Sequence, residues 1–138
     1  MKLWDERFAT GHQQIDDEHR SFCSQLDGIK QAIAEGAGRE QIVQLIVVLQ
    51  KYALRHFARE EAYMLRVNCP AQKANCTAHR ELEAKLERWL ELLTMSGAPV
   101  SVLSDVHRES TSWIADHILN IDCQLRGCVQ NQTQSVKS

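Results

Sequence analysis

Four long segments of this chain repeat apolar residues at a period near 3.6, and this repeat limits the possible folds more than any other feature of the sequence. The first segment carries a stripe formed by His19, Phe22, Leu26, Ile29 and Ile33. Three further segments carry similar stripes, and short breaks at 35–38, at Pro70 and at 96–101 separate the four. There is little period-2 alternation and no Asn-Gly or Asp-Gly hairpin signal, so we expect helices and no sheet.

Four amphipathic segments with short connections predict an all-α protein, an antiparallel up-down-up-down four-helix bundle with an N-terminal arm. The expected helices span residues 17–36, 40–66, 71–95 and 101–125. The arm, residues 1–16, is expected to pack across the bundle through Leu3, Trp4 and Ile15. The length of 138 residues is one domain's worth.

We place the domain at residues 1–126 and expect the polar segment 127–138 to be a frayed tail. The formal charge of −2, with acids and bases interspersed, predicts no nucleic-acid partner. There is no apolar run long enough for a membrane span, and the N-terminus does not resemble an export signal, so we expect a cytoplasmic protein with no membrane partner. The five cysteines form no CxxC pair, which favours free thiols in a reducing compartment.

Each expected helix places one histidine on its apolar face, namely His19, His56, His79 and His117. A single buried histidine is most often a core residue with hydrogen-bond partners of its own. Four of them, one from each helix, favour a shared site instead. The other two histidines, His12 and His107, are expected at the surface or at a helix boundary.

Two carboxylates complete this pattern. Glu60 follows His56 by four residues, so both side chains leave one face of a helix. Asp122 follows His117 by five residues, a spacing that suits a carboxylate reaching a second metal ion. Imidazoles and carboxylates inside a bundle commonly hold iron or manganese. Glu61 is either a solvated charge or a partner of a ligand.

Three motifs in this order resemble the hemerythrin family, specifically the bacterial hemerythrin-like proteins. They are "LWDERFATGHQQIDDEH" near the N-terminus, "HFAREEAYM" at 56–64 and "WIADHILNID" at 113–122. The resemblance covers roughly residues 4 to 123 and implies two non-haem iron ions bridged by an oxo or hydroxo group. It implies that His19 and His56 bind one iron, that His79 and His117 bind the other, and that Glu60 and Asp122 bridge both.

The resemblance also implies an apolar pocket for O2, lined by Phe57, Trp113, Ile114 and Ile118. The chain departs from the family at Asn75, where the family has the first histidine of an HxxxH motif. Four candidates remain open for that coordination position: the Asn75 amide oxygen, Glu83, Cys76 and water. Two exchangeable positions would favour water, peroxide or NO over reversible O2 storage.

The resemblance therefore predicts a di-iron protein that binds O2 or another small diatomic or peroxide ligand, for sensing, storage or delivery. We expect any signal to pass to a separate partner protein. One alternative is a di-iron oxidase or peroxidase, so enzymatic activity stays open, although binding is favoured. The other is iron or mixed-metal homeostasis, or a redox sensor without reversible O2 binding.

Overall fold

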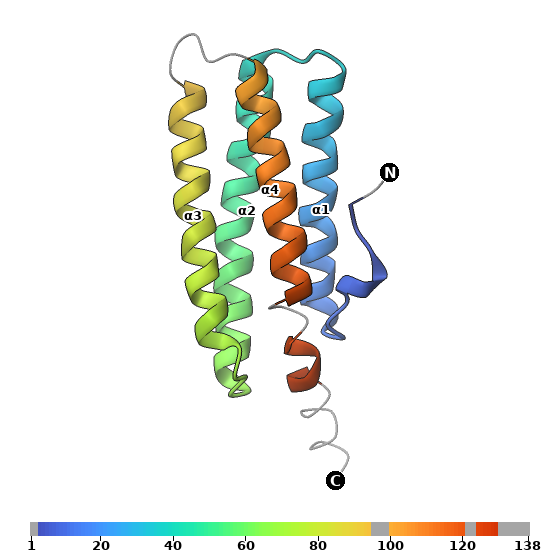
Figure 1. The fold of residues 1–138 in the computed structure, drawn as a ribbon. Coiled ribbons are helices and arrows are strands. Elements are labelled where there is room, and N and C mark those ends of the chain that lie inside the picture. Colours follow the sequence, from blue (N-terminus) through green and yellow to red (C-terminus); the bar gives the residue numbers. More distant parts are fainter. Residues whose placement is uncertain (1–2, 95–99, 121–123, 130–138) are drawn as a thin grey trace.

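The computed structural model describes residues 3–94, 100–120 and 124–129, and its architecture is a four-helix bundle. The helices are α1 (Gln13–Ala34), α2 (Arg39–Arg66), α3 (Gln72–Thr94) and α4 (Val100–Asn120). Each helix packs against the next one in the sequence, and α4 closes the bundle against α1 (Figure 1). No helix among these described residues has the length and apolar character needed to cross a membrane.

The predicted fold class is confirmed, and one clear difference from the predicted helix boundaries lies at the start of α1. This helix begins at Gln13 instead of residue 17, so Ile15 belongs to the helix and not to the arm. Local capping explains the earlier start. The ring of His12 accepts a hydrogen bond from the backbone N–H of Ile15, and the Asp16 carboxylate accepts bonds from the N–H and hydroxyl of Thr10 and from the N–H of Gly11.

Backbone turns end the first two helices. Gly36 adopts a positive φ of 76°, and the following residue donates a backbone hydrogen bond to Ala32. Asn68 has a φ of 54° at the end of α2, and Cys69 donates to the carbonyl of Met64. Both turns satisfy carbonyl groups that a helix end leaves without partners, and both let the chain reverse direction within a few residues.

The N-terminal arm packs along α1 through Leu3 and Trp4, as we predicted. A single 3-10 turn, η1 (Glu6–Phe8), buries Phe8 against the main core. The backbone N–H of Leu3 donates to the Asp27 carboxylate at 3.0 Å, and the Arg20 guanidinium lies 4.7 Å from the centre of the Trp4 ring.

Two separate apolar clusters fill the bundle. The main cluster includes Phe22, Leu49, Phe57, Leu86 and Ile118. A smaller one lies at the end where α2 turns into α3, and its members are Ile15, Met64, Cys69, Ala71 and Leu125. Leu125 belongs to a short helical segment at 124–129 that follows α4 at the lower end of the bundle in Figure 1.

The expectation that all cysteines are free thiols is wrong for two of them. Cys69 and Cys128 form a disulfide with their Cα atoms 5.8 Å apart. They are 59 residues apart in sequence, so only the folded bundle brings them together. Residues 127–129 are therefore held to the bundle, while residues 130–138 of the expected tail lie outside the described part of the chain.

We predict that Leu86→Ala will lower the free energy of unfolding by about 2–5 kcal/mol, because Leu86 is 1% exposed within the main cluster and its truncation leaves a cavity. Leu92→Ala on the same helix is the matched control. Leu92 is 42% exposed, so we expect a change within about 0.5 kcal/mol. Urea denaturation followed by circular dichroism measures both. Equal losses in the two variants would contradict this assignment of the core.

Candidate metal centre

The centre of the candidate site is the carboxylate of Glu60, which is fully buried on α2. Its Oε2 lies 3.0 Å from Nε2 of His19 and 3.1 Å from Nε2 of His56. Its Oε1 lies 3.4 Å from Nε2 of His79 and accepts a hydrogen bond from the Asn75 amide. The two oxygens of this one side chain therefore face two different pairs of residues.

Two groups of donor atoms result, and Glu60 belongs to both. The first contains His19, His56 and Glu60, and the second contains Glu60, His79 and His117. Within each group the ligand atoms lie within 4.8 Å of one another, and every member is buried. Four helices supply these residues, as the position of one histidine on each apolar stripe predicted.

Electrostatics keeps Glu60 ionised. Burial opposes the charge, but the imidazoles of His19, His56 and His79 that surround the carboxylate outweigh it and hold the pKa of Glu60 well below its usual range. A buried carboxylate that faces two sets of imidazole nitrogens is a ligand set suited to divalent cations, and a bound cation would neutralise the carboxylate charge.

Buried polar atoms also fit a metal pair. Neither Nε2 of His79 nor Oδ1 of Asn75 has a hydrogen-bond partner within the described residues. Both side chains are 0% exposed. An orphaned buried donor or acceptor costs free energy, and coordination of a cation would remove that cost.

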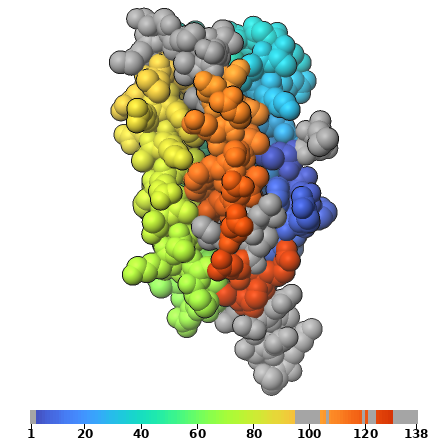
Figure 2. All heavy atoms as spheres, in the orientation of Figure 1, coloured from blue at the N-terminus to red at the C-terminus, as the bar shows by residue number. Residues whose placement is uncertain are grey.

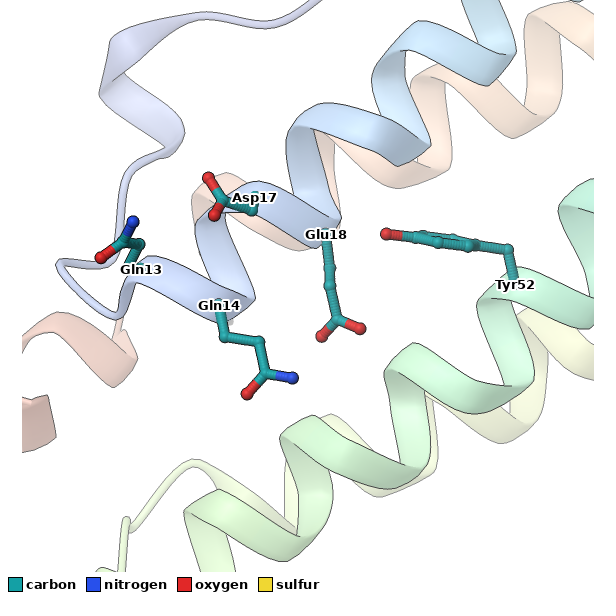
Figure 3. A pocket seen from close by; sticks show the side chains of 5 residues that line it. All are labelled: Gln13, Gln14, Asp17, Glu18 and Tyr52. Carbon is teal, nitrogen blue, oxygen red and sulfur yellow. The ribbon is translucent and has the colours of Figure 1, made fainter.

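The outer nitrogens of two histidines are held by carboxylates, each paired with an arginine. Nδ1 of His56 lies 3.2 Å from Glu18, whose other oxygen lies 3.0 Å from Arg59. Figure 3 shows the Glu18 side chain reaching from α1 toward α2, beside a surface pocket. This contact orients the ring so that Nε2 points inward.

The second histidine has the same kind of support. Nδ1 of His79 lies 3.0 Å from Glu61, and the Arg80 guanidinium donates to the same carboxylate at 2.7 Å. Of the two interpretations given for Glu61, the structure favours a partner of a ligand. Sequence reasoning missed Glu18, because nothing in "DDEH" indicates which carboxylate reaches across to α2.

The residues considered for the coordination position at Asn75 differ in their contacts. Glu83 is not in either donor group, and its carboxylate lies 3.0 Å from Arg80. Cys76 is also outside both groups; its sulfur accepts a bond from the Gln72 amide, and desolvation together with a hydrogen bond to Glu61 raises the pKa of the thiol to about 11. Of these three residues, only Asn75 is seen to hydrogen-bond to Glu60 within the described residues, and it also contacts the sulfur of Met64 at 2.9 Å.

An apolar cavity adjoins the donor atoms. Its free volume of about 10 Å³ is near the minimum that holds one water-sized molecule. All four residues predicted to line the ligand pocket, Phe57, Trp113, Ile114 and Ile118, line this cavity. Phe22 lines it too and was not predicted as a pocket residue.

Aromatic stacking fixes two of the imidazoles against this cavity. The rings of Phe57 and His79 are stacked with centroids 3.9 Å apart, and those of Trp113 and His117 with centroids 4.5 Å apart. The last predicted ligand, Asp122, lies outside the described residues, so its role stays a prediction.

Comparisons with known proteins identify the family of this chain. Residues 10–125 match the hemerythrin HHE cation binding domain. The chain is 27% identical to bacteriohemerythrin of Pseudomonas aeruginosa (strain LESB58) over 120 residues, which cover 87% of this chain and 76% of that protein. It is 24% identical to myohemerythrin of Riftia pachyptila and 25% identical to that of Sipunculus nudus, in each case over 91% of both chains.

We predict that Glu18→Gln will weaken metal binding by about 10–100-fold, because the neutral amide no longer holds the outer nitrogen of His56 as a carboxylate does. Competition with a coloured chelator measures the affinity. Asp17→Asn is the matched control. Asp17 is exposed and pairs only with Arg20 among the described ion pairs, so the metal affinity of this variant should equal that of the parent. Parent-like affinity in both variants would show that Glu18 does not position His56.

Proposed function

Because the chain belongs to the hemerythrin family, we propose that it is a non-haem di-iron protein that binds O2 or a related small molecule in the core of its bundle. The observation that carries this proposal is the position of Glu60. One of its oxygens faces His19 and His56, and the other faces His79, so a single carboxylate would contact both ions.

In this proposal His19 and His56 hold one ion, His79 and His117 hold the other, and Asp122 supplies a second bridge. When bound, the iron pair supplies the electrons and the open coordination position that a diatomic or peroxide ligand requires. The glutamates behind His56 and His79 each contact the outer nitrogen of the ring, so that Nε2 is directed toward the proposed ions.

The apolar cavity would serve to exclude water and protons from the bound ligand. Phe57, Ile114 and Ile118 are each less than 5% exposed, so this wall of the cavity is buried and apolar. A dry wall slows proton transfer to a reduced oxygen ligand and thereby slows oxidation of the site.

Asn75 favours a second candidate function, a di-iron oxidase or peroxidase. The amide nitrogen of Asn75 is turned toward Glu60, so its oxygen does not face that carboxylate. With no third imidazole, the ion at His79 and His117 would keep an exchangeable position. Sensing, storage and delivery remain the favoured roles. The separate signalling partner and the cytoplasmic location stay predictions.

The direct test is metal content per chain together with the visible absorption spectrum before and after addition of O2. We expect two iron ions per parent chain and a reversible O2-dependent absorption change.

Glu60→Ala and Asp122→Ala should each hold fewer than two ions, while Glu81→Ala, an exposed position on α3, should match the parent. Two ions in both bridge variants would refute the bridging assignment, and rapid irreversible bleaching would favour the oxidase.

We further predict that Asn75→His will slow metal loss, because an imidazole at this position completes the coordination of the second ion. The measurement is the rate of iron transfer to a chelator, with autoxidation rate recorded in parallel. Lys73→His places a histidine on the exposed side of the same helix and should behave like the parent. If Asn75→His lost iron as fast as the parent while retaining its thermal stability, a strong ligand would already fill that position.

A further inference from the structure

The segment 124–129 after α4 is fastened to the bundle by noncovalent contacts on two sides. Leu125 is 0% exposed within the smaller apolar cluster, beside Met64 and Ala71. On the other side, the Arg126 guanidinium donates to the carbonyl of Ala9 at 2.6 and 3.0 Å and to that of Arg7 at 3.1 Å. Figure 2 shows this segment between the green α2–α3 end and the blue N-terminal arm.

A covalent bond adds to these contacts. The disulfide between Cys69 and Cys128 joins the segment to the turn between α2 and α3. Cys69 is 5% exposed, whereas Cys128 is only half-buried. Cys128 is therefore the more exposed residue of the pair and the one at which attack by a thiolate is expected.

The disulfide is connected to the candidate metal centre by a short series of contacts. The backbone N–H of Cys69 donates to the carbonyl of Met64 at 2.8 Å. The sulfur of Met64 accepts from the Asn75 amide at 2.9 Å, and the same amide donates to Glu60. These contacts join the α2–α3 turn to the side of the centre where the chain has Asn75 in place of a third imidazole.

We infer that the Cys69–Cys128 disulfide is a redox-controlled latch, which a dithiol reductant opens and which sets how firmly the ion beside Asn75 is held. The part of this inference that concerns the ion rests on the proposed function. The latch itself is defined by Cys69, Cys128, Leu125 and Arg126, and it stands on contacts that involve no metal.

The chemistry of opening is thiol–disulfide exchange. One thiolate of the dithiol attacks the sulfur of Cys128, the S–S bond breaks, and Cys69 leaves as a thiolate that takes up a proton. The second thiol of the reductant then attacks the mixed disulfide and releases Cys128. The reductant ends as a disulfide, and two electrons and two protons have passed to the two cysteines.

The first test uses the metal-free protein. Alkylation under denaturing conditions, followed by peptide mass mapping, should find residues 69 and 128 in one cross-linked species until dithiothreitol is added. Hydrogen exchange at 64–75 and 124–129 should be slow in the oxidised parent and faster after reduction. Cys128→Ser should exchange fast under both conditions. Absence of the cross-link, or exchange that does not respond to reduction, would overturn the latch.

The second test is release of Fe²⁺ to a chelator without O2. We expect reduction to accelerate release from the parent about fivefold or more, the lower end of typical coupling between sites. Cys128→Ser should release iron fast with or without reductant, which controls for metal binding by the reagent itself. Cys76→Ser, which keeps the disulfide, should respond as the parent does.

The outcomes of the two tests are separable. Equal release rates from oxidised and reduced parent would overturn the control of metal retention. A chain that takes up no iron in either redox state would refute the proposed function and this coupling together, whereas the hydrogen-exchange result would still decide whether the latch exists.

Discussion

The burial of one charged carboxylate, Glu60, is the constraint on which the rest of this structure depends. An ionised group with 0% exposure is very costly unless charges or hydrogen bonds compensate it. Here imidazoles from α1, α2 and α3 provide that compensation, and together they outweigh desolvation in setting the pKa of Glu60. The helices must therefore meet at one level, and this requirement fixes their register as firmly as the apolar stripes do.

The two apolar clusters are arranged around this polar layer. Along α2, Phe57 belongs to the main cluster and Met64 to the smaller one, with Glu60 between them. The main cluster contains most of the buried apolar residues among those described, and several of them also line the apolar cavity. The smaller cluster closes the opposite side, where the disulfide and Leu125 hold the segment after α4. The main core and the disulfide-linked segment thus lie on opposite sides of the polar layer.

The site itself has a clear asymmetry. His56 and His79 are both supported by a carboxylate and an arginine, so the two donor groups are alike in their outer contacts. They differ at Asn75, which offers an amide in place of an imidazole and shares its nitrogen between Glu60 and Met64. A weaker donor that is joined by contacts to the disulfide-linked turn is the physical basis of the proposed coupling between metal retention and redox state.

The sequence by itself determined the bundle, the four inward histidines and the shared face of His56 and Glu60, because each depends on periodicity within one helix. The residues expected around the cavity followed from the family resemblance instead. Spacing of three or four residues fixes which side chains share a face, whatever the other helices do. Only the tertiary structure decided that Glu18 supports His56, that Glu83 pairs with Arg80, and that Cys69 joins Cys128. The contacts of Glu18 and Cys69 join segments far apart in the chain, and the Glu83 side chain had several partners within reach. Helical period carries no information about which of those partners the packed bundle selects.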